Sequence, residues 1–164
     1  KEIHANDILN ELRAHVIKSL RQTGKEGESK DGMDIALCII DTENMELEFS
    51  GANNPLLLVR NEELQVFKGD KMPIGIHHRA KEPFNLHTIN LQEGDILYTH
   101  SDGYVDQFGG PEGKKFMSKK FKELLVEIHK KDMQEQKSIL ENTLMDWMKN
   151  TEQVDDVLVM GVRI

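Results

Sequence analysis

The sequence has little of several residue types, and each shortage excludes a class of protein. Its 164 residues include one cysteine, Cys38, which excludes an internal disulfide and a cysteine-based zinc site and indicates a reducing compartment, the cytoplasm. Lys and Arg (21) are fewer than Asp and Glu (29), so the net charge of −8 disfavours nucleic acid and anionic membranes as partners. No apolar run approaches the roughly 20 residues of a membrane-spanning helix. We therefore expect one acidic globular domain over residues 1–164.

The hydrophobic pattern of the first two thirds predicts a helix followed by short strands. The helix is expected over residues 7–22, with Asn6 or Asp7 as its N-cap. Residues 33–100 contain alternating apolar and polar stretches separated by turn residues, which is typical of antiparallel strands. Two of these strands meet in a hairpin around Asn61-Glu62.

The last third predicts helices and a closing strand. An apolar stripe marks one helix over residues 121–128, and Asp132 with Glu135 resembles the capping box of a second. The β-branched run over residues 157–164 predicts a buried strand. The whole order predicts an α+β fold in which helices cover antiparallel sheets.

Two acidic segments stand where strands end or begin. Ser101-Asp102-Gly103 follows one expected strand, and Asp155-Asp156 precedes the last. If those strands are antiparallel neighbours, both acidic segments lie at the same edge of the sheet, where carboxylate oxygens favour Mg²⁺ or Mn²⁺. The alternative is that Asp102-Gly103 is only a turn and that Asp155-Asp156 is only the solvated start of a strand.

These segments resemble the two late motifs of metal-dependent (PPM-type) serine/threonine protein phosphatases. The motifs are Ser101-Asp102-Gly103 with Asp106, and Asp155-Asp156-x-x-Val. The likeness is strongest to the bacterial branch typified by the stage II sporulation protein E phosphatase. Three further segments resemble that branch in the right order: Asp31-Gly32-Met33, Gly51-Ala52-Asn53-Asn54-Pro55-Leu56 and Pro73-Ile74-Gly75.

The resemblance implies a fold and a site. The fold is a sandwich of two antiparallel β-sheets flanked by helices. Asp102 and Asp155 bind Mn²⁺ or Mg²⁺, two ions in a complete domain, and a metal-activated water replaces a protein nucleophile. Asp156 is then a neighbouring acid, and Asp106 is either a further acid near the metals or a helix cap. His100 either hydrogen-bonds a carboxylate of the site or is structural.

One motif of the family is missing from the sequence. It contains no Asp-x-x-Gly-His-Gly segment, whose Asp bridges both metals in the family. We therefore expect the chain to be the C-terminal, larger part of the phosphatase domain without its first strands, or else a degenerate relative. Metal binding and phosphatase activity are expected to be weak or absent in this chain alone. An uncovered sheet edge would also favour a homodimer.

The resemblance implies dephosphorylation of phosphoserine or phosphothreonine on a bacterial regulatory protein, such as an anti-sigma-factor antagonist. The domain would be the cytoplasmic output end of a larger signalling protein. One alternative is a non-catalytic, phosphatase-like binding module. Another is an acidic α+β domain in which Asp102 and Asp155 never meet. The lysines of residues 114–120 either attract a phosphorylated acidic partner or form a solvated charge run.

Overall fold

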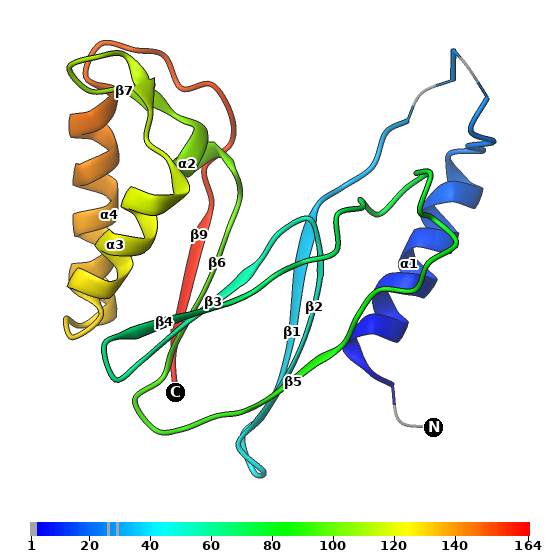
Figure 1. Ribbon diagram of the computed structural model, residues 1–164, viewed down its shortest axis with the longest axis horizontal. Helices are drawn as coiled ribbons and strands as arrows, with labels where there is room; N and C mark the ends of the chain where they lie inside the picture. Colours follow the sequence, from blue (N-terminus) through cyan, green and yellow to red (C-terminus); the bar gives the residue numbers. More distant parts are fainter. Residues whose placement is uncertain (1–2, 26, 29) are drawn as a thin grey trace. The chain divides into compact units, whose positions relative to one another are not determined.

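Along the chain, helix α1 is followed by strands β1 to β6, then by helices α2 to α4 with the short strands β7 and β8 between α2 and α3, and last by strand β9 (Figure 1). The computed structural model describes residues 3–25, 27–28 and 30–164. Antiparallel sheets and helices are both present, so the predicted α+β class is confirmed. Within the described part of the chain, none of the helices combines the length and apolar composition that a bilayer-spanning segment requires.

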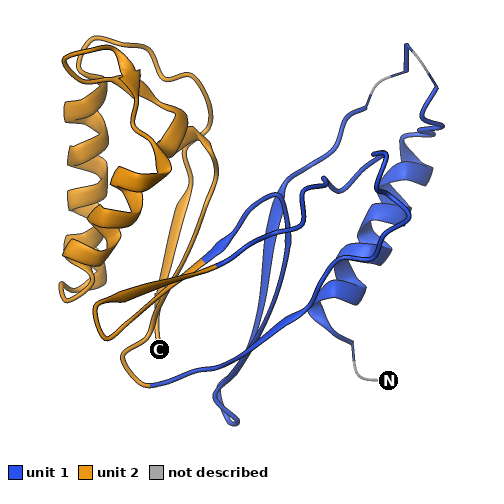
Figure 2. Ribbon diagram, in the orientation of Figure 1, with its two compact units in different colours: residues 1–56, 67–92 blue, residues 57–66, 93–164 orange. Residues whose placement is uncertain are grey.

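The chain divides into two compact units (Figure 2). The first unit consists of the described residues up to 56 together with residues 67–92, and the second consists of residues 57–66 and 93–164. The grouping of residues 1–164 into one functional domain stays a prediction.

The first unit has a three-stranded antiparallel sheet in the order β1-β2-β5. Its elements are α1 (Ala5–Ser19), β1 (Ile35–Asp41), β2 (Glu46–Ala52) and β5 (His87–Asn90). Cys38 pairs with Phe49 across the first two strands, and Leu47 pairs with Ile89 across the next two. A buried cluster holds the unit together, and its members are Leu9, Ala52, Met72, Ile74 and Phe84.

The predicted cap of the first helix is wrong. The helix begins at Ala5 with His4 as N-cap, and the side chain of His4 makes no capping hydrogen bond. Glu48 of β2 accepts the Ala5 N–H at 2.9 Å, and its other oxygen lies 2.6 Å from the His4 ring nitrogen. A carboxylate distant in sequence therefore satisfies the helix end, which local pattern could not reveal.

The second unit has a four-stranded sheet in the order β4-β3-β6-β9. The strands are β3 (Leu56–Arg60), β4 (Glu63–Phe67), β6 (Ile96–His100) and β9 (Val159–Arg163), with a small β7–β8 hairpin (Phe108–Gly109, Lys114–Lys115). The helices are α2 (Gly103–Asp106), α3 (Ser118–Ile128) and α4 (Met133–Met148). The predicted β3–β4 hairpin is confirmed: Asn61 and Glu62 have φ of 50° and 69°, the positive values that a tight hairpin turn requires.

The two predictions for the end of the chain had different outcomes. Asp132 caps α4 as predicted, because its carboxylate accepts the Glu135 N–H at 2.8 Å. The prediction of a buried closing strand is wrong: β9 is an edge strand, and Met160 is 56% exposed. Its β-branched residues reflect strand geometry, which an edge strand needs as much as a central one.

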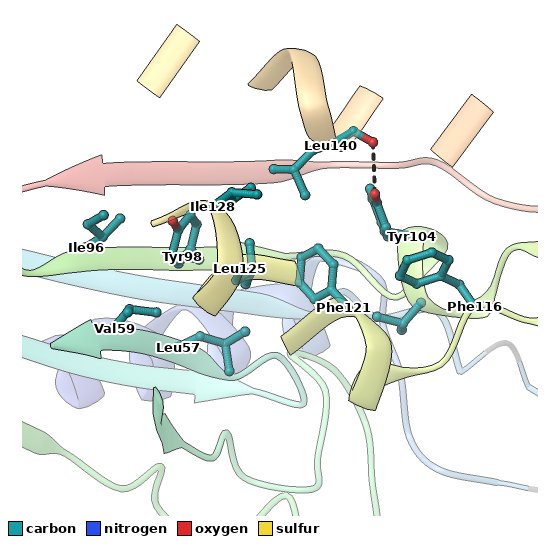
Figure 3. Close-up of a cluster of buried hydrophobic side chains, with 11 residues drawn as sticks. Leu57, Val59, Ile96, Tyr98, Tyr104, Phe116, Phe121, Leu125, Ile128 and Leu140 are labelled. Carbon is teal, nitrogen blue, oxygen red and sulfur yellow. Dashed lines mark hydrogen bonds between the residues drawn. The ribbon is translucent and has the colours of Figure 1, made fainter. Parts of the chain in front are cut away.

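A hydrophobic core fixes β6 and the α2 region of the second unit (Figure 3). Tyr104 packs against Phe116 and Phe121, and its hydroxyl donates to the Leu140 carbonyl of α4 at 2.8 Å. The Tyr98 hydroxyl donates to Gln136 at 2.6 Å, and burial raises the pKa of Tyr98 to about 12. Because β6 and α2 are both anchored in this core, the turn between them has a defined position.

Candidate functional site

The Ser101-Asp102-Gly103 turn joins the end of β6 to the start of α2. Asp102 is the N-cap residue of this short helix, and its carbonyl accepts the Asp106 N–H at 2.9 Å. The Asp102 side chain makes no capping hydrogen bond and is exposed. The turn therefore presents a carboxylate to solvent from a backbone that is fixed on both sides.

The acidic segment before β9 returns to this turn. β6 and β9 are antiparallel neighbours with His100 paired to Val159, as the candidate site required. The Ser101 hydroxyl donates to the Asp156 carbonyl at 2.8 Å and accepts the Leu158 N–H at 3.0 Å. The Ser101 N–H also donates to the Leu158 carbonyl at 3.0 Å. Ser101 thus ties the two acidic segments together through their backbones.

Gly103 explains why the turn needs its glycine. A Cβ at this position would lie 2.3 Å from the Asp156 carbonyl oxygen and 3.3 Å from that of Asp155. Both obstacles are backbone atoms, which cannot move aside as the end of a flexible side chain can. The close approach of residues 102–103 to residues 155–156 is therefore possible only without a side chain at Gly103.

The carboxylates at this edge differ in their hydrogen bonding. Asp155 accepts the Asp156 N–H at 2.7 Å, and both residues are exposed. Asp102 has neither a hydrogen bond nor an ion pair to its carboxylate among the described residues. Those residues also include no group of three or more His, Cys, Asp or Glu side chains suited to hold a metal ion. The oxygens of Asp102 and Asp155 suit Mg²⁺ or Mn²⁺, which binds through one or two carboxylates and keeps several waters.

His100 and Asp106 each have a definite contact near the turn. The His100 ring lies 4.8 Å from the Phe121 ring, and its Nδ1 is 2.8 Å from the Ser101 carbonyl oxygen. Burial lowers the pKa of His100, partly opposed by that hydrogen bond. Asp106 forms an ion pair with Lys115 at 2.9 Å. Supporting roles for these two residues at a metal site stay predictions.

Gln107 is a residue near the site that the sequence pattern did not predict. It is fully buried, its amide donates to the Glu152 carbonyl at 2.9 Å, and its side-chain oxygen accepts the Val154 N–H at 3.2 Å. These bonds hold residues 152–154, and hence the start of the acidic segment, against the end of α2. No local pattern around Gln107 predicts this role, because its partners lie about 45 residues later in the chain.

The remaining segments that resemble the phosphatase family assemble in the first unit. Residues 31–33 lie against residues 73–75, because Met33 and Ile74 exchange backbone hydrogen bonds of 3.1 and 2.9 Å. Residues 51–53 lie against residues 69–70, where the Asn53 N–H donates to the Asp70 carbonyl at 2.8 Å. These contacts shape loops and bring no cluster of metal ligands together within the described residues.

Solved structures with the same fold include phosphatase domains. The SiaA-PP2C domain of Pseudomonas aeruginosa has a TM-score of 0.78 at 24% identity, covering 97% of this chain and 69% of that chain. The phosphatase domain of the cell fate determinant SpoIIE from Bacillus subtilis has a TM-score of 0.62 at 18% identity, covering 100% of this chain and 75% of that chain. The RsbU and RsbW domains of Rv1364c from Mycobacterium tuberculosis have a TM-score of 0.60 at 17% identity, covering 93% of this chain and 47% of that chain.

Sequence comparison gives the family. No curated protein matches the chain. A family model described as stage II sporulation protein E (SpoIIE) matches residues 1–164. Since the match spans the whole sequence and the fold is that of PP2C-type phosphatase domains, the chain belongs to the stage II sporulation protein E (SpoIIE) family.

Proposed function

We propose that the chain supplies part of a divalent-metal site, the part formed by the two acidic segments at Asp102 and Asp155. At the complete site, phosphoserine or phosphothreonine on a protein would be hydrolysed. The observation that carries this proposal is the Ser101 link, which holds residues 101–103 against residues 155–158 in a SpoIIE-family chain. Asp102 and Asp155 are the proposed Mn²⁺ or Mg²⁺ ligands, and Asp156 is the neighbouring acid.

The chain's own residues would position the ligands. Ser101 and Gly103 keep the two acidic backbones together, and Gln107 holds the start of the second segment. The core beneath β6 and α2 limits movement of the turn, which favours a fixed coordination geometry. A bound divalent cation would neutralise phosphoryl charge and activate water for attack on phosphorus.

Two carboxylates alone would form only part of such a site. The sequence contains no Asp-x-x-Gly-His-Gly segment. We therefore propose that this chain by itself binds Mn²⁺ weakly and hydrolyses p-nitrophenyl phosphate slowly. Efficient Mn²⁺-dependent hydrolysis by the purified chain would contradict that expectation.

The proposed setting is a bacterial signalling protein in the cytoplasm. The substrate would be a phosphorylated regulatory protein, with an anti-sigma-factor antagonist as the first to test. The exposed edge of β9 also favours pairing with a second copy, since an unpaired strand offers free backbone groups. Light scattering at two concentrations tests this, and a monomer at both would rule the homodimer out.

The deciding experiment compares variants of the full-length protein on a phosphoserine peptide with Mn²⁺. We expect Asp155→Ala to abolish turnover, whereas Asp146→Ala, an exposed acid of α4, should leave it unchanged. Equal rates for the two variants would remove the site assignment. An inactive wild type that still binds the phosphoprotein would instead support the second candidate, a non-catalytic binding module. That candidate is favoured by the lack of a three-ligand cluster among the described residues.

A further inference from the structure

A groove of about 600 Å³ lies beside the β7–β8 hairpin in the second unit. Its lining combines apolar side chains with lysines, and includes Phe108, Met117, Trp147, Lys114, Lys115 and Lys120. The Lys115–Asp106 ion pair joins the hairpin to the end of α2, the helix that starts directly after Asp102. The groove is therefore built on the same short stretch of chain as the proposed phosphatase site.

The groove is preformed, because the hairpin is clamped onto α4 at Trp147. The Gly110 N–H donates to the Trp147 carbonyl at 2.8 Å, and the Trp147 ring N–H donates to the Gln107 carbonyl at 3.0 Å. A Cβ at Gly109 would lie 1.9 Å from the Trp147 carbonyl oxygen, so this strand residue must be glycine. A preformed groove loses little conformational freedom when a ligand binds.

Two large apolar side chains remain uncovered on this surface. Phe108 is 42% exposed and Met117 is 56% exposed. Met117 has a φ of 77°, which is uncommon for a residue with a side chain, and its N–H donates to the Val105 carbonyl at 2.8 Å. The fold thus holds the Met117 side chain outward at a conformational cost, and Met117 and Phe108 line the same groove.

The charge of the groove is opposite to that of the chain. Its lining includes three lysines, Lys114, Lys115 and Lys120, and one acid, Glu112, whereas the whole chain has a net charge of −8. Lys115 pairs with Asp106, and Lys114 pairs with Glu112. The Lys120 ammonium lies 4.0 Å from the centre of the Trp147 ring and has no carboxylate partner among the described residues. Lys120 is therefore a cation available to an acidic ligand.

We propose that this groove docks an acidic segment of a partner protein, with a carboxylate on Lys120 and an apolar side chain against Phe108 and Met117. The inference rests on the proposed function, because it assigns the segment to the phosphorylated protein substrate. A nucleic acid is disfavoured as the occupant, since the chain's net charge of −8 repels a uniform polyanion and the exposed Phe108 and Met117 reward an apolar side chain.

Trp147 is the only tryptophan, so its fluorescence reports on the groove directly. The probe is a synthetic twelve-residue peptide of Glu and Leu, added to the purified chain. We expect a saturable change in Trp147 emission, lost when Gln replaces Glu or when Ala replaces Leu in the peptide. Binding of a dye-labelled peptide, followed by anisotropy, should weaken about tenfold in Lys120→Gln and in Phe108→Ser. Lys137→Gln, which removes one charge from α4 outside the groove, should have no effect.

The result separates this inference from the proposed function. No saturable change, equal binding of the Glu/Ala peptide, or unchanged affinity in Lys120→Gln and Phe108→Ser would overturn the groove assignment, even if the full-length protein is a phosphatase. Equal binding of the Glu/Ala peptide would mean that the lysines attract any polyanion. Peptide binding with the expected variant effects would support the groove even if phosphatase activity were absent.

Discussion

Asp41 in the first unit and Asp102 in the second both stand where a strand gives way to a turn, yet their carboxylates differ. Asp41 accepts the Glu43 and Asn44 N–H groups at 2.9 and 3.0 Å, and its other oxygen accepts the Asn44 side-chain amide at 2.8 Å. These bonds, led by those from Asn44, lower the pKa of Asp41. Asp102 has none of them among the described residues. A carboxylate saturated by its own turn is structural, whereas an unsaturated one at a constrained turn is available to a cation.

The largest effect expected from this comparison is on catalysis. Asp102→Asn keeps the size of the side chain and removes its charge. Mn²⁺-dependent turnover of the full-length protein should therefore fall at least about 100-fold, because mutation of residues that only hydrogen-bond a metal ligand already lowers activity about 10–100-fold. Asp41→Asn should change turnover by less than about threefold, because ordinary surface changes are small. Initial rates on a phosphoserine peptide check both, and equal losses would break the comparison.

The next largest effect concerns the close approach at Gly103. Gly103→Ala places a methyl group against the Asp156 carbonyl oxygen, and overpacking of this kind costs about 1–3 kcal/mol of unfolding free energy. The control is Gln134→Ala, which also introduces an alanine but lies at an exposed position of α4. Urea unfolding measures the difference, and two equally stable variants would mean that the segments do not meet as described.

Removal of the Gln107 amide tests whether the second acidic segment is held in place. Gln107→Ala removes a fully buried side chain and leaves the Glu152 carbonyl and the Val154 N–H without the partner in their part-buried hydrogen bonds, a cost of about 1–3 kcal/mol. We also expect weaker Mn²⁺ binding, because Asp155 follows directly. Gln134→Ala, an exposed position of α4, is the matched control for both measurements. Unchanged Mn²⁺ affinity in Gln107→Ala would restrict this residue to stability.

The smallest effect is a pH dependence at His100. Because burial lowers the pKa of His100 in the folded state, the unfolded state takes up the proton first as pH falls below about 6.5. The neutral ring therefore contributes stability above that pH, which is lost on acidification, at most about 1.4 kcal/mol per pH unit. His100→Phe removes this loss. Urea unfolding at pH 7.5 and 5.5 should show a steeper decline for wild type, and parallel declines would contradict the assignment.

Features that depend on residues close together in the sequence could be predicted, and features that depend on distant residues could not. Local chemistry identified the Asn61-Glu62 hairpin and the Asp132 cap, because each depends on neighbouring residues. It failed at the start of α1, where Glu48 of a later strand satisfies the helix end, and at β9, whose exposure depends on sheet order.

The same difference between local and distant interactions applies to the candidate site. Asp102 and Asp155 were identifiable because Asp-Gly and Asp-Asp stand at strand ends and resemble family motifs. Gln107 was not, because its partners Glu152 and Val154 lie about 45 residues away in the chain. The metal role of Asp102 and Asp155 stays a prediction.

The proposed phosphatase site depends most on a divalent cation binding at Asp102 and Asp155, which paramagnetic broadening can test even when binding is weak. Substoichiometric MnCl₂ is added to the ¹⁵N-labelled chain, and amide signal intensities are followed residue by residue, with excess EDTA as the reversal. We predict that signals of residues 101–103 and 155–156 broaden first and that Asp102→Asn abolishes the effect at Asp155. Broadening at Asp155 that survives Asp102→Asn would contradict a shared cation site.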